Sequence, residues 1–83
     1  MSAMMNDEPL PVLHAAAAKA RTALGLRYLP VVIRSESSAF AVADRTSASV
    51  VMLGEDAFWV VCLADAAKLE RAGYEWAPRP SAR

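Results

Sequence analysis

The sequence predicts a small α+β domain: an N-terminal helix, an antiparallel four-stranded meander and a C-terminal helix. Three observations favour this fold class. Eighty-three residues allow one hydrophobic core. Apolar residues recur at helical spacing near both ends of the chain, and the middle is rich in short β-type runs separated by turn residues. We expect one domain over residues 9–77, a flexible leader over 1–8 and a flexible tail over 78–83.

Two helices are predicted, one near each end of the chain. The first covers residues 11–24, where an alanine run with high helix propensity is followed by Gly25, a typical residue for ending a helix. The second covers residues 64–72. Asp65 is expected to be its N-terminal charge or cap, and Gly73 its stop.

Four short runs between these helices are predicted strands. Residues 26–35 come first, and Pro30 within them favours an edge strand or a bulge, because proline has no N–H to donate to a neighbouring strand. The short loops predict that consecutive strands pair as a meander. Residues 74–76 alternate and allow a short fifth strand. The other predicted strands are 39–43, 49–53 and 57–62, with turns at 36–38, 44–47 and 54–56.

The last of these four strands is apolar on both sides. One side carries Phe58 and Val60, and the other carries Trp59 and Val61. An antiparallel sheet with two apolar faces needs cover on both. Two alternatives stay open: a helix covers each face, or one face is an interface, for example with a second copy of the chain. Trp59 is accordingly either a core residue, which is the outcome we expect, or the centre of an interface.

Composition and charge argue against several classes of function. Nine basic residues balance nine acidic ones, so the chain lacks the basic excess typical of direct nucleic-acid binding. No apolar run approaches the roughly 20 residues of a membrane helix. The N-terminal residues do not resemble a signal peptide, and Met1, Met4 and Met5 are all candidate start positions. With Cys62 as the single cysteine, we expect a soluble protein of the reducing cytoplasm.

We expect no catalytic, metal or cofactor site. Cys62 and His14 are the only pair that could supply a nucleophile and its base, but a cysteine that ends an apolar strand is typical of a buried structural residue. A metal site would have only these two residues as sulfur and nitrogen ligands, so carboxylates would have to supply the others. The acidic residues show no spacing typical of metal ligands. The chain has no glycine-rich phosphate loop and no nucleophile elbow. The sequence therefore predicts a non-enzyme without a cofactor.

Acidic residues define the candidate partner-binding surface. Residues 36–75 carry seven acidic side chains against three basic ones. An acidic surface can occupy a groove built for phosphates, because the arginines and lysines there attract negative charge. The alternative is that these acids are only solvated turn residues. The candidate partner-binding residues are Glu36, Asp44, Glu55, Asp56, Glu75 and Trp59.

The run from Phe58 to Ala77 combines a predicted strand, a capped helix and the aromatic segment 74–76. It resembles the ending of short reading frames common in phages and prophages of GC-rich bacteria, and it contains no functional residue to carry over. The resemblance implies a small orphan protein, of the kind that includes anti-CRISPR proteins, that binds and blocks a host complex. Our leading hypothesis is a non-catalytic protein-binding module, in its sharpest form a phage-type inhibitor of a bacterial nucleoprotein complex. The alternative is a homodimeric structural or accessory protein.

Overall fold

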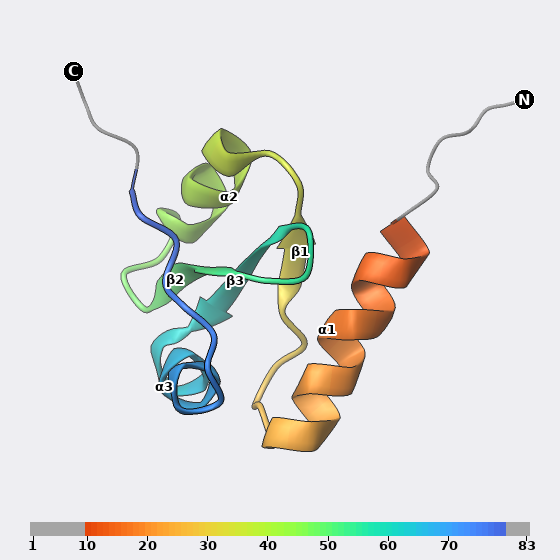
Figure 1. Ribbon diagram of the computed structural model, residues 1–83. Coiled ribbons are helices and arrows are strands. Elements are labelled where there is room, and N and C mark those ends of the chain that lie inside the picture. Colours follow the sequence, from red (N-terminus) through yellow and green to blue (C-terminus); the bar gives the residue numbers. More distant parts are fainter. Residues whose placement is uncertain (1–9, 80–83) are drawn as a thin grey trace, which may run out of the picture.

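The computed structural model describes residues 10–79, which form three helices and a three-stranded antiparallel sheet (Figure 1). The α+β class is confirmed. The predicted leader 1–8 and residues 80–83 of the predicted tail lie outside the described residues. The elements follow in the order α1 (Leu10–Leu24), β1 (Val31–Ile33), α2 (Glu36–Ala43), β2 (Ser49–Leu53), β3 (Phe58–Cys62) and α3 (Leu63–Arg71).

The predicted four-stranded meander is wrong. The strands lie in the order β1-β3-β2, so β3 is central and β1 pairs with it rather than with the next strand along the chain. Only the β2–β3 hairpin joins consecutive strands, with Met52 opposite Trp59. Helix α2 connects the two edge strands and packs against β2 and β3 on the way.

Residues 36–43, predicted as a turn followed by a strand, form helix α2 instead. Ser35 has an extended backbone, and its Oγ accepts a hydrogen bond from the Ser38 N–H at 3.3 Å, as in a helix N-cap. Glu36 adds a negative charge in the first turn, where the helix dipole favours it. Apolar spacing over five residues does not distinguish a short strand from a helix, so the serine cap was the informative signal.

Strand β1 is shorter than the predicted 26–35. The N–H groups of Arg27 and Tyr28 bond to the Asp65 carboxylate instead of to a neighbouring strand. The strand therefore begins only after Pro30. The prediction that this proline marks an edge strand is confirmed, because β1 lies at one edge of the sheet.

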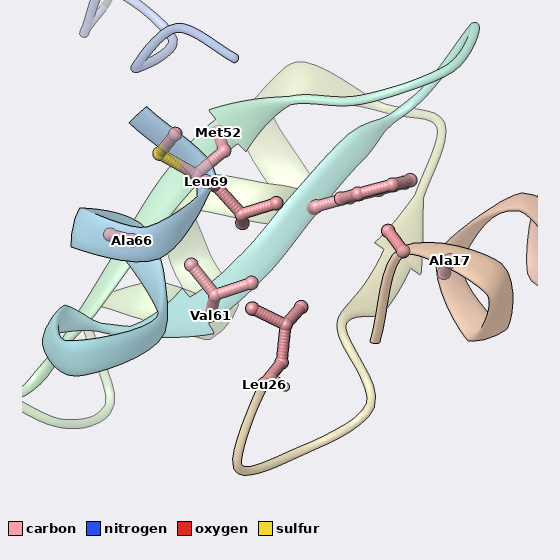
Figure 2. Packing of buried hydrophobic residues seen from close by; sticks show 8 residues of the cluster. Ala17, Leu26, Met52, Val61, Ala66 and Leu69 are labelled. Carbon is pink, nitrogen blue, oxygen red and sulfur yellow. The ribbon is translucent and has the colours of Figure 1, made fainter. Parts of the chain in front are cut away.

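Helices cover both faces of the sheet, but not one predicted helix per face: the two predicted helices lie on the same face, and α2, which was predicted as a turn and a strand, covers the other. Helix α2 covers one face, and α1 and α3 cover the other. Figure 2 shows the cluster of buried residues on the face that α1 and α3 cover. Leu26 and Val61 lie there between Ala17 of α1 and Ala66 of α3. The α2 cluster comprises Ala39, Phe40, Ala43, Val51, Val60 and Ala77; the other comprises Ala17, Ala20, Leu26, Met52, Trp59, Val61, Ala66 and Leu69.

Trp59 belongs to the core, as expected. Its side chain is fully buried and stacks on Tyr74, with the ring centroids 5.3 Å apart. Gly54 lies directly against the indole, and a Cβ atom at this position would overlap the ring. The hairpin backbone thus approaches the tryptophan closely enough to require glycine at position 54.

Candidate functional site

Four of the five acidic candidates gather at the hairpin end of the sheet. Glu55 and Asp56 form the tip between β2 and β3. Glu75 lies beside this end, because its carbonyl accepts the Leu53 N–H at 2.8 Å. Glu36 follows β1 at the same end, since the last residue of β1 pairs with the first of β3. All four side chains are exposed.

The other two candidates lie elsewhere. Asp44 is at the opposite end of α2, where its carboxylate accepts two hydrogen bonds from the Arg79 guanidinium, at 2.8 and 3.3 Å. The hydrogen bonds and the positive charge of Arg79 hold the pKa of Asp44 below its usual value. Trp59 is buried in the core and therefore does not belong to the surface of this chain.

The chain covers the edge of the sheet formed by β2. Leu53 donates its N–H to the Glu75 carbonyl, and Ala77 donates its N–H to the Val51 carbonyl at 2.9 Å. Between them, Trp76 forms an isolated antiparallel bridge with Met52. The predicted short fifth strand at 74–76 is thus present as a single bridge, and Figure 1 shows this segment running alongside β2.

The ladder between β2 and β3 shows which residues of β3 bond to which neighbour. The Gly54 N–H donates to the Ala57 carbonyl, and the Leu63 N–H donates to the Ala48 carbonyl. Hydrogen-bonded pairs alternate along an antiparallel ladder. The odd-numbered residues of β3 therefore bond to β2, and the even-numbered residues bond to β1.

No segment within residues 10–79 pairs with the outer edge of β1. Val31 and Ile33 lie opposite even-numbered residues of β3, so their N–H and C=O groups face inward. Val32 lies between them, and its N–H and C=O face away from the sheet. Over residues 10–79, no hydrogen bond joins these two groups to another part of the chain. Helix α1 contacts β1 but packs Ala17 and Ala20 on the Trp59 face of the sheet.

Large exposed apolar side chains precede and begin this open strand. Tyr28 is 61% exposed, Leu29 52% and Val31 50%. The Arg27 guanidinium lies 5.9 Å from the centre of the Tyr28 ring. Sequence reasoning missed these residues as a candidate surface, although the proline next to them correctly indicated an edge.

Asp65 fixes the loop that leads into this strand. Its buried carboxylate accepts the Arg27 N–H at 2.8 Å and the Tyr28 N–H at 3.1 Å, and the Lys68 ammonium donates to the Gly25 carbonyl at 2.7 Å. Burial raises the pKa of Asp65, but the two N–H donors and the charge of Lys68 outweigh this effect and hold the pKa below its usual value. The prediction of Asp65 as the N-terminal charge of this helix is confirmed, because it lies in the first turn of α3. The alternative that it caps the helix is wrong, because the N-cap residue is Cys62.

Cys62 and His14, the candidate nucleophile and base, lie on different elements, at the end of β3 and in α1. Cys62 is half-buried at the end of β3 with the Asp65 carboxylate as its charged neighbour, whereas forming a thiolate needs a positive one. His14 is exposed on α1. Among the described residues, no group of three or more His, Cys, Asp or Glu side chains could hold a metal ion.

A hollow of about 550 Å³ separates α1 from the segment that follows α3. Alanines such as Ala16 and Ala20 form much of one wall, and Tyr74 lies on the other. Lys19 and Glu55 supply charges of opposite sign to its lining. The short alanine side chains of α1 leave this space beside the Tyr74 segment.

No family model matches the chain, and comparisons with curated proteins and with solved structures also find no match. The relationship to short phage and prophage proteins therefore stays a prediction. None of the helices in the described part of the chain has the length and apolar character to cross a membrane.

Proposed function

We propose that the protein is a non-catalytic protein-binding module that takes up an extended segment of a partner along the open edge of β1. One observation carries the proposal: within residues 10–79, the β2 edge is covered by the chain and the β1 edge is not. An open strand edge offers unpaired N–H and C=O groups, on which an extended segment of another chain can pair as an added strand.

The side chains around the edge support a protein partner. Tyr28, Leu29 and Val31 are three of the six large apolar residues that are exposed within residues 14–79. Aromatic and arginine side chains are enriched in protein interfaces, and Arg27 beside Tyr28 supplies both. Contact with a partner would remove this apolar area from water while the backbone groups pair.

Site-specific photo-cross-linking tests the proposal. A photoreactive amino acid replaces Val31 in one variant and Leu53 in a control, because the two side chains are 50% and 38% exposed and Leu53 lies on β2, at the other edge of the sheet. We expect position 31 to cross-link to one extended segment, identified by mass spectrometry of the cross-linked peptides, and position 53 to give no such product. Equal products from both positions would contradict a role for the β1 edge.

The inhibitor hypothesis concerns a different part of the surface. Its support is the gathering of Glu36, Glu55, Asp56 and Glu75 at the hairpin end of the sheet, which brings negative charge together where a basic groove could receive it. DNA binding by a purified bacterial CRISPR effector complex, measured with and without the protein, tests this hypothesis.

Two variants are compared in this assay. One reverses the charge at the hairpin tip by combining Glu55→Lys with Asp56→Lys, and the other places a lysine on the β1 edge by Val31→Lys. Inhibition that the tip variant loses and the edge variant keeps would place the function at the acidic end. Absence of inhibition by the parent protein would remove the hypothesis for that complex.

We also propose that the protein acts in the cytoplasm. Its support is Cys62, the single cysteine, which is a free thiol and suits a reducing compartment. The non-catalytic assignment is supported by the carboxylate neighbour of this thiol.

A further inference from the structure

We infer that the segment received by the β1 edge is β1 of a second copy of this chain, so that two sheets join across a two-fold axis at Val32. This inference rests on the proposed function and names the partner for the same edge. The joined sheet would have six strands, with the two covered β2 edges on the outside.

The backbone of β1 has the self-complementarity that a two-fold axis requires. Val32 presents one outward donor and one outward acceptor, and two antiparallel copies centred on this residue exchange both hydrogen bonds. Every outward group of the strand then has a partner. Pro30 ends the pairing on one side, because it is buried and has no N–H.

The side chains beside the axis are also compatible with self-pairing. With the axis at Val32, Val31 lies opposite the partner's Ile33, on the face of the sheet that α2 covers. Val31 is half-exposed in the single chain, so pairing places two β-branched side chains together. Arg34 lies opposite the partner's Pro30, so the two arginines do not face each other.

The net charge of the chain and the size of the interface determine how strong a dimer we expect. The chain has nine basic and nine acidic residues, so two copies have no net repulsion to overcome. The paired region is short, and interfaces below about 1,200 Å² are usually weak, so we expect a reversible dimer with a dissociation constant of roughly 0.1–1 mM.

Sedimentation equilibrium from about 10 µM to about 1 mM tests the inference in this range. We expect the parent chain to change from monomer toward dimer as the concentration rises. Val31→Lys should weaken dimerisation by at least about tenfold, because a charge at an edge position opposes strand pairing. Leu53→Lys, which puts the same charge on an exposed apolar position of β2 at the other edge of the sheet, should dimerise as the parent does.

Results that overturn the dimer can be distinguished from results that overturn the proposed function. A parent chain that stays monomeric at about 1 mM, or a Val31→Lys variant that dimerises as well as the parent, overturns the second copy as the occupant. A monomeric parent whose position 31 still cross-links to a segment of another protein leaves the proposed function standing. A monomer without such a product overturns both.

Discussion

The two edges of this sheet differ in what covers them. At the β2 edge, the chain returns after α3 and pairs residues 75–77 with the outward groups of Val51 and Leu53. At the β1 edge, the outward N–H and C=O of Val32 have no hydrogen-bond partner among the described residues, and exposed apolar side chains lie next to them. Natural sheets usually protect their edges with charge, proline, short strands or covering chain, and at β1 the protection is limited to a three-residue strand that follows Pro30. An edge left open beside a covered one is therefore the more informative surface of this protein.

The largest effect is expected at the central strand that both edges share. Trp59→Ala should lower the free energy of unfolding by about 3–5 kcal/mol, because it empties a fully buried site. A domain of this size has only about 4–12 kcal/mol of stability, so the variant should be poorly folded. Trp59→Phe is the control and should cost much less, since Nε1 has no hydrogen-bond partner among the described residues. A melting temperature of Trp59→Ala within a few degrees of the parent would contradict the core placement.

The next effect concerns the loop that leads into the open edge. Asp65→Ala should cost about 2–4 kcal/mol, because it leaves the Arg27 and Tyr28 N–H groups without their charged acceptor. Asp44→Ala removes an exposed carboxylate instead and should cost clearly less. Urea unfolding of both variants measures the difference, and equal costs would show that the Asp65 contacts do not fix the loop.

The contribution of Asp65 to the stability of the folded chain should depend on pH in one direction. The pKa of Asp65 is lowered in the folded chain from its usual 3.8, so the ionised form favours folding. The stabilisation by Asp65 is complete above the pKa that its carboxyl has in the unfolded chain. It is lost as the pH falls through the lower pKa that this carboxyl has in the folded chain. The difference in unfolding free energy between the parent and Asp65→Ala should therefore shrink as the pH falls below 3.8. A difference that grows toward acid would contradict the assignment.

A smaller effect is expected beside the covered edge. Gly54→Ala should cost about 1–3 kcal/mol, because the added methyl group overlaps the indole of Trp59 and the hairpin must shift. Glu55→Ala, at the next residue on the exposed tip, is the matched control and should be close to neutral. Chemical denaturation compares the two, and a neutral Gly54→Ala would mean that the hairpin relaxes freely.

The smallest effect is expected at the residue that ties the covering segment to α2. Arg79 bonds to Asp44 and lies 4.7 Å from the centre of the Phe40 ring, and both contacts are lost in Arg79→Ala. The pair is exposed, so stability should change little. The carboxyl signal of Asp44, followed by NMR against pH, should show its pKa rising toward the usual value. An unchanged pKa would show that the ion pair does not form in solution.

The sequence predicted the parts of the fold that local chemistry determines. The alanine run of α1, the hairpin strands 49–53 and 57–62 and the first-turn acid Asp65 were found close to their observed places. Helix α2 was missed because its serines were interpreted as turn residues and its five apolar positions also fit a strand. The strand order depends on contacts between distant segments, which no local pattern contains.

The candidate surface was likewise predictable only where it depends on local chemistry. Four acids were predicted from charge alone, and the sheet brings them to one end. The open edge could not be predicted, because it depends on which strand the C-terminal segment covers. Pro30 gave the one local indication, since it favours an edge position wherever the strand lies.

Amide hydrogen exchange at two residues tests the difference between the edges most directly. In dilute protein, the Leu53 amide should exchange slowly because it donates to the Glu75 carbonyl, whereas the Val32 amide should exchange quickly although it lies within a strand. As the concentration rises toward about 1 mM, protection should appear at Val32 in the parent chain and not in Val31→Lys. A Val32 amide that is already protected in dilute protein would contradict the account, because the β1 edge would then be covered by the chain itself.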